Sequence, residues 1–275
     1  MVRAVRKGRY KYIRNFQPHF YDGLMNNYRY KQLAYQEWND LQENGELNEI
    51  QSVFFIFKEP EYLFDLDSDP FETINLASES NLSSVLFDMR SELNSWIKDM
   101  PDLSFYPEYI LIDSAFSNPT GFGLRHKKDI SKYLDVANLS LSEFHQIEQK
   151  IIKSLNSSDL YERYWALTAI ISFGEEAVKL TPLLSSISKE DPTLINRVRA
   201  SEFLAIVSKV DPTESLTNCL YSSNKPAEAL LILNSIVLMG SYSYGYDFEI
   251  ELSKIDDNVK KDSQVKRRLE YLKVI

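Results

Sequence analysis

The residues with the clearest capacity for chemistry are arginines near the start of the chain. Residues 1–33 hold eight Lys and Arg side chains against one acidic residue. A planar guanidinium can donate two parallel hydrogen bonds to a fixed anion, so Arg6, Arg9 and Arg14 are candidate contacts for an anionic ligand. The alternative is that these charges solubilise an edge hairpin and keep its strands from pairing with other chains.

A second candidate is the acidic run at Asp65, Asp67 and Asp69. Its alternate spacing matches the first ligands of a calcium-binding loop. However, Pro70 stands where such a loop needs glycine, and no glutamate closes the loop at twelve residues. The pattern therefore predicts a turn.

Histidine and cysteine provide no recognisable site. His19, His126 and His145 are far apart in the sequence, and we expect them to be structural or on the surface. The single cysteine, Cys219, excludes an intrachain disulfide and a cysteine-rich zinc site, and it is predicted to be a small buried helix residue. We assign no catalytic, cofactor-binding or metal-binding residue.

Composition limits the classes of function. The chain has 275 residues, 44% of them hydrophobic, with few glycines and prolines, which is typical of a compact, helix-rich protein with room for two domains. Its net charge of −9 argues against nucleic acid as a partner, because phosphate binding needs Lys and Arg. No apolar run approaches the length of a membrane span, and no apolar segment of an export signal follows the charged start.

The elements that must position these residues divide at about residue 100. Alternating residues predict a β-hairpin over 2–16, and three- and four-residue apolar spacing predicts a helix over 27–43. A short helix over 47–55, a strand over 60–66 and a helix from about 80 to 97 follow. Residues 1–100 are thus predicted to form a small α+β unit, an antiparallel sheet with packed helices.

The second half follows a different pattern. Residues 101–137 contain several prolines and glycines without a steady period, and we expect an irregular connector. Residues 138–275 show one amphipathic helix after another, and Ala166 recurs as Ala200 at an offset of 34 residues. This pattern resembles HEAT-like helical repeats. The alternative is an ordinary helical bundle.

Two motifs in the first part resemble the C-terminal subdomain of sulfatases, in particular the N-sulfoglucosamine sulfohydrolase-like and heparan-sulfatase-like branch. Residues 3–16 follow the pattern R-x-V-R-x-G-R-Y-K-Y-I. Residues 61–77 follow E-x-L-Y-D-L-x-x-D-P-x-E-x-x-N-L-A, with Phe64 in place of the usual tyrosine. The resemblance covers about residues 2–100. Both motifs supply strand faces and a turn, which are scaffold.

The resemblance also implies what the rest of such an enzyme contains. A sulfatase uses a formylglycine made from a Cys/Ser-x-Pro-x-Arg motif, and a calcium held by Asp and Asn, in its larger N-terminal domain. Cys219 does not fit, because Tyr221 and Ser223 stand where proline and arginine should be. We therefore expect the chemistry to belong to a missing N-terminal domain, together with the export signal, and the family implies a periplasmic or secreted location.

Two functions follow as hypotheses. In the first, the chain is the C-terminal portion of a sulfatase whose full-length parent removes sulfate from a sulfated glycan, and the chain alone is inactive. Arg6, Arg9 and Arg14 would then make remote glycan contacts. In the second, the chain is a non-catalytic helical-repeat module that binds protein or carbohydrate on its concave face. The sequence names no protein partner for the repeats.

Overall fold

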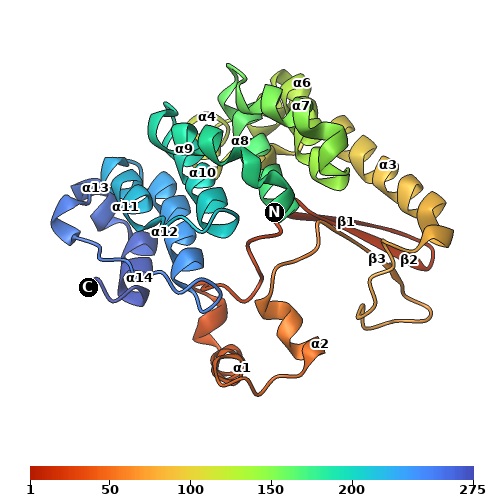
Figure 1. Cartoon of the computed structure of the whole chain (residues 1–275), viewed down its shortest axis with the longest axis horizontal. Coiled ribbons are helices and arrows are strands. Elements are labelled where there is room, and N and C mark those ends of the chain that lie inside the picture. The colour runs from red at the N-terminus through yellow and green to blue at the C-terminus, as the bar shows by residue number, and fades with distance from the viewer.

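A computed structural model describes residues 1–275, and it is mostly helical with one small antiparallel sheet. The sheet and helix α3 (Ser83–Asp99) form one end of the molecule, and the later helices follow as an arc that ends at the C-terminus (Figure 1). The predicted order of an α+β part followed by helices is confirmed at this level.

The sheet has the order β1-β2-β3, with β1 at Val2–Lys7, β2 at Tyr10–Asn15 and β3 at Glu61–Asp65. Gly8 supplies the positive φ of 61° that the tight turn between β1 and β2 requires. Val5 pairs with Tyr12 and Tyr12 with Leu63, so these three apolar side chains share one face of the sheet.

Helix α3 covers that face (Figure 1). Its buried residues recur at three- and four-residue spacing, which is the helical period expected from the sequence: Leu86, Met89, Leu93 and Ile97. The opposite face of the sheet has no helix on it. It presents Val2, Ala4, Ile13 and Tyr62, and Val2 is 41% exposed.

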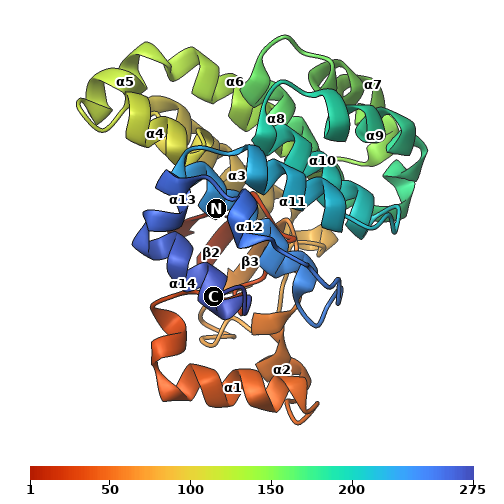
Figure 2. The ribbon, with the colours of Figure 1, turned by 90° about the vertical axis from the view of Figure 1, so that its left-hand side faces the viewer.

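Helices α1 (Leu33–Glu43) and α2 (Glu49–Ser52) form an arm that projects from the body (Figures 1 and 2). Neither helix has a buried residue. The arm is held by aromatic contacts, in which Trp38 stacks on Phe54 with ring centroids 4.5 Å apart and meets Phe55 edge-on at 5.5 Å.

The prediction of an irregular connector over residues 101–137 is wrong in its local structure. It contains α4 (Glu108–Ser114), α5 (Pro119–Arg125) and α6 (Lys127–Ala137). The prolines do not break these helices, because Pro107 and Pro119 lie at helix N-terminal ends, where a missing N–H costs no hydrogen bond.

The remaining helices come in consecutive pairs, and α8, α10, α12 and α14 pack against one another in that order. Their bounds are α7 Phe144–Leu155, α8 Leu160–Ile170, α9 Thr181–Glu190, α10 Leu194–Ile206, α11 Thr213–Ser222, α12 Pro226–Gly240, α13 Asp257–Lys261 and α14 Ser263–Tyr271. The sequence predicts one helix after another here, and this is confirmed, whereas the assignment to HEAT-like repeats stays a prediction.

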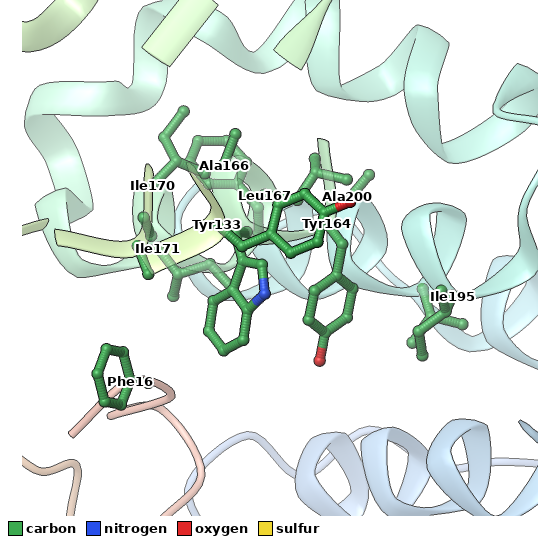
Figure 3. Packing of buried hydrophobic residues seen from close by; sticks show 14 of the residues in the cluster. Phe16, Tyr133, Tyr164, Ala166, Leu167, Ile170, Ile171, Ile195 and Ala200 are labelled. Carbon is green, nitrogen blue, oxygen red and sulfur yellow. The ribbon is translucent and has the colours of Figure 1, made fainter. Parts of the chain in front are cut away.

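One buried apolar cluster connects the sheet with the helical arc. At its centre Phe16, which follows β2, meets Trp165 of α8 and Phe105 with ring centroids 6.0 and 5.2 Å apart. Figure 3 shows Phe16 reaching toward the helices from the N-terminal segment. The Trp165 indole donates a hydrogen bond to the Phe105 carbonyl at 2.9 Å, so the buried N–H is satisfied.

Candidate functional site

The three arginines singled out by the sequence have different environments. Arg6 is exposed, and its guanidinium makes one hydrogen bond, from Nε to the Gly8 carbonyl at 3.2 Å. Arg9 is a partner of Asp65, to which it donates two hydrogen bonds, and the hydrogen bond from Arg9 lowers the pKa of that carboxyl. The structure does not bring Arg6 and Arg9 together with Arg14 in one exposed patch.

Arg14 is only 2% exposed. Its guanidinium donates to the carbonyls of Pro60 and Ala137 at 2.9 and 2.8 Å and to Ser140 Oγ at 2.7 Å. Burial lowers the pKa of Arg14 to about 10, which still leaves it charged at neutral pH. Its hydrogen bonds therefore join the sheet to the C-terminal end of α6.

Residues 16–27, which we call the linking segment, run from β2 past α8, α10 and α14. Next to Phe16, Gln17 donates from Nε2 to the Tyr164 hydroxyl of α8 at 2.9 Å. Further along, the carbonyl of Met25 accepts from Arg268 of α14 at 2.8 Å. Both views place this segment, on its way from β2 to α1, beside α14 (Figures 1 and 2).

The linking segment carries one histidine into a buried charged cluster. His19 is 1% exposed, and its Nε2 lies 3.4 Å from Oε2 of Glu202 in α10. Glu202 forms a fully buried ion pair with Arg199, one turn earlier in the same helix. The Arg199 guanidinium also lies over the rings of Phe20 and Tyr164, 5.0 and 5.5 Å from their centroids.

The pKa values of this cluster describe a paired, sequestered set of groups. Burial opposes ionisation of Glu202, but the charge of Arg199 together with His19 and Ser235 outweighs it and holds the pKa of Glu202 at about 2. Burial lowers the pKa of His19, although Glu202 opposes that change. At neutral pH the cluster is therefore a carboxylate, a guanidinium and a neutral imidazole.

A pocket of about 510 Å³ opens beside this cluster, and Arg199, Tyr164, Gln17 and Asn234 are among its lining residues. Arg199 already donates to both oxygens of Glu202, and the imidazole of His19 is not in the lining. The arrangement suits the fixing of the linking segment to α8 and α10 better than proton transfer to a bound molecule.

The acidic run forms the predicted turn. The Asp69 carboxylate accepts from the backbone N–H groups of Thr73 and Ile74 at 2.7 and 2.8 Å, and Asp65 accepts from Arg9. Both carboxylates are thus held by the turn and the hairpin. No group of three or more His, Cys, Asp or Glu side chains lies close enough together to hold a metal ion.

The expectation for Cys219 is confirmed. It is 4% exposed in α11, and burial raises the pKa of its thiol to about 11. At neutral pH it is a thiol, which is a poor nucleophile compared with a thiolate.

Comparison with known proteins points to the same family as the two motifs. Over 118 residues the chain is 39% identical to an ulvan-active sulfatase of Formosa agariphila. Part of this chain is sulfatase-like. The matched region is 42% of this chain, and it spans about a fifth (20%) of the length of that relative. No family model matches the chain, and no solved structure matches it.

Sequence reasoning missed the buried cluster. The sequence predicts His19 to be structural or on the surface, and it does not distinguish Arg199 and Glu202 from other charged helix residues. A weak signal exists, because Arg199 and Glu202 are opposite charges one turn apart in a helix whose other residues include a regular apolar series. No helix is both long and apolar enough to serve as a membrane span.

Proposed function

We propose that this chain is the C-terminal portion of a sulfatase whose full-length parent hydrolyses sulfate esters of a sulfated glycan. The observation that carries the proposal is the 39% identity to a sulfatase over 118 residues. It is supported by the pairing of the two motif-bearing segments as neighbouring strands β2 and β3, although they lie some fifty residues apart in sequence. The assignment to the heparan-sulfatase-like branch belongs to this proposal.

In this proposal the chain supplies scaffold and surface. The formylglycine and the calcium belong to an N-terminal domain of the parent. The face of the sheet that α3 leaves open, with Val2, Ala4, Ile13 and Tyr62 beside Arg6 and Lys11, is a suitable surface for packing against such a domain, because its apolar side chains are stabilised when they are removed from water. The paired helices, as HEAT-like repeats, would extend the surface available to the polymer.

The second hypothesis, a binding module that uses the concave face of the repeats, has less support. The linking segment lies along α8, α10 and α14 and buries Phe16 and His19 there. A ligand of that face would have to displace side chains that are already fully packed.

The decisive experiment is to sequence the genomic DNA immediately upstream of the codon for Met1. The proposal expects an open frame that continues back through a Cys/Ser-x-Pro-x-Arg motif to a signal peptide. That full-length protein, once expressed and purified, should then release inorganic sulfate from a sulfated polysaccharide. An in-frame stop codon directly before Met1 would instead favour the non-catalytic binding module.

A remote glycan contact from the hairpin is proposed for Arg6, since Arg9 is paired with the Asp65 carboxylate and Arg14 is buried. Substitution Arg6→Glu should shorten retention of the chain on a heparin column. Lys266→Glu, which reverses an exposed charge on α14, is the control. Equal retention of Arg6→Glu and the unaltered chain would rule out this contact.

A further inference from the structure

A wide hollow lies between α5, α6 and α7, outside the motif-bearing sheet. Its volume is about 1020 Å³. We call it the basic groove, and it is lined by Leu124, Arg125, Lys127, Lys128, Ser131, Lys132, Asp135, Val136, Leu139, Lys150 and Ser154. The lining holds five cationic side chains and one carboxylate, although residues 34–137 as a whole carry seven Lys and Arg against twenty acids.

Helix geometry explains why these charges converge. Lys128, Lys132 and Asp135 follow one another at spacings of four and three residues, so they lie along one side of α6. Lys150 and Ser154, four residues apart on α7, face the same hollow from the other wall. Figure 2 shows α5 and α6 following each other along the upper edge of the molecule, with α7 next in the chain.

The groove's charges fall into two sets. Lys132 donates to Asp159, Lys127 lies 3.7 Å from a carboxylate oxygen of Asp99, and the acidic Asp135 accepts from Lys98 at 2.6 Å. Arg125, Lys128 and Lys150 are exposed and have no carboxylate within ion-pair distance. These three cations are therefore available to an external anion.

We propose that the basic groove binds an anionic polysaccharide through Arg125, Lys128 and Lys150, a substrate-holding site that rests on the proposed function and adds a polymer contact outside the sheet. Cations on two walls of a wide hollow suit a polymer with repeated anions better than one small ion. Leu124, Val136 and Leu139 provide apolar surface for the C–H faces of sugar rings.

The lining favours a polysaccharide over nucleic acid. It contains no aromatic side chain on which a base could stack. The net charge of −9 also repels a duplex, which carries about one phosphate charge per 1.7 Å of its axis. A glycan with more widely spaced anions meets less of this repulsion.

The test is binding of dextran sulfate to the full chain, measured by calorimetry at two salt concentrations, with unsulfated dextran and a DNA duplex as comparison probes. The variant carries Arg125→Gln, Lys128→Gln and Lys150→Gln. The matched control carries Lys261→Gln, Lys266→Gln and Arg267→Gln, which remove the same residue types from α13 and α14 without touching a carboxylate partner. Circular dichroism should show that both variants keep the fold.

We expect the groove variant to bind dextran sulfate about tenfold more weakly at low salt. Its affinity should also depend less steeply on salt, because a variant with fewer cationic contacts releases fewer counterions from the polymer on binding. The control should stay within about twofold of the unaltered chain, and unsulfated dextran should not bind. The proposal would be overturned if both variants lost affinity equally or if the groove variant bound as well as the unaltered chain. It would also be overturned if the unaltered chain did not bind dextran sulfate or bound DNA more tightly. None of these results touches the upstream reading frame, so the two proposals fail independently.

Discussion

Two basic regions of this chain contrast in burial. At the junction between sheet and helices, Arg14 and Arg199 are 2% exposed each, and their guanidinium groups donate to protein acceptors. In the basic groove, Arg125 is exposed and has no carboxylate partner. The difference shows that burial and pairing decide whether an arginine holds the fold together or stays available to solvent.

The largest expected effect tests the buried ion pair. Glu202→Gln leaves the Arg199 guanidinium buried without its counter-charge, so the free energy of unfolding should fall by about 3 to 5 kcal/mol. Urea unfolding measures this change. The control is Glu251→Gln, because Glu251 and Lys254 form a pair with the same spacing that is more than half exposed, and its loss should cost under about 1 kcal/mol. Similar losses of unfolding free energy in both variants would show that burial does not increase the contribution of the Arg199–Glu202 pair to stability.

The next effect tests Arg14 against Arg6 in the same hairpin. Arg14→Met replaces the guanidinium with an apolar group and removes its buried hydrogen bonds to the carbonyls of Pro60 and Ala137, which keep the Asn15 N–H and the Ser140 hydroxyl as donors. We expect a loss of about 3 kcal/mol in the free energy of unfolding, because each hydrogen bond from a charged group contributes about 1.5 to 3 kcal/mol. Arg6→Met should change it by less than about 0.5 kcal/mol. A stable Arg14→Met variant would show that the junction does not depend on these bonds.

A smaller effect concerns pH. Burial lowers the pKa of His19 below its usual value of 6.5, while Glu202 opposes and Arg199 reinforces the change. Below about pH 6.5 the unfolded chain therefore binds a proton that folded His19 does not bind. The free energy of unfolding should decrease as the pH is lowered, by at most about 1.4 kcal/mol per pH unit. His19→Gln should remove this part of the slope between pH 6.5 and 5.5. His145→Gln, at an exposed histidine of α7, is the control, and an unchanged slope in His19→Gln would contradict the assignment.

The smallest expected effect concerns the stability contribution of the exposed cations in the basic groove. Arg125→Gln, Lys128→Gln and Lys150→Gln together should change the free energy of unfolding by less than about 0.5 kcal/mol, because exposed, unpaired side chains contribute little to stability. Thermal unfolding of the triple variant provides the measurement. A loss comparable to that of Arg14→Met would mean that the groove's charges are structural after all.

The sheet and its helix could be predicted because their signals are local. The alternation in 2–16, the turn at Asp65–Asp69 and the apolar spacing of α3 each depend on residues close in sequence. The connector could not be predicted, since Pro107 and Pro119 indicate a break unless one knows that each lies at the start of a helix. For the proposed glycan contact, the sequence favours the basic charge of the hairpin, whereas in the structure Arg9 and Arg14 of that hairpin are held by protein acceptors.

By itself the sequence determined the class of each half, the resemblance to sulfatases and the buried state of Cys219, because periodicity and motifs are properties of neighbouring residues. Only the tertiary structure decided which charges are available. Arg14 is surrounded by carbonyls from residues 60 and 137, and Glu202 meets His19 from 183 positions away, whereas Lys128 and Lys150 share an open groove. Burial depends on which distant segments pack together, and that information is spread over the whole chain.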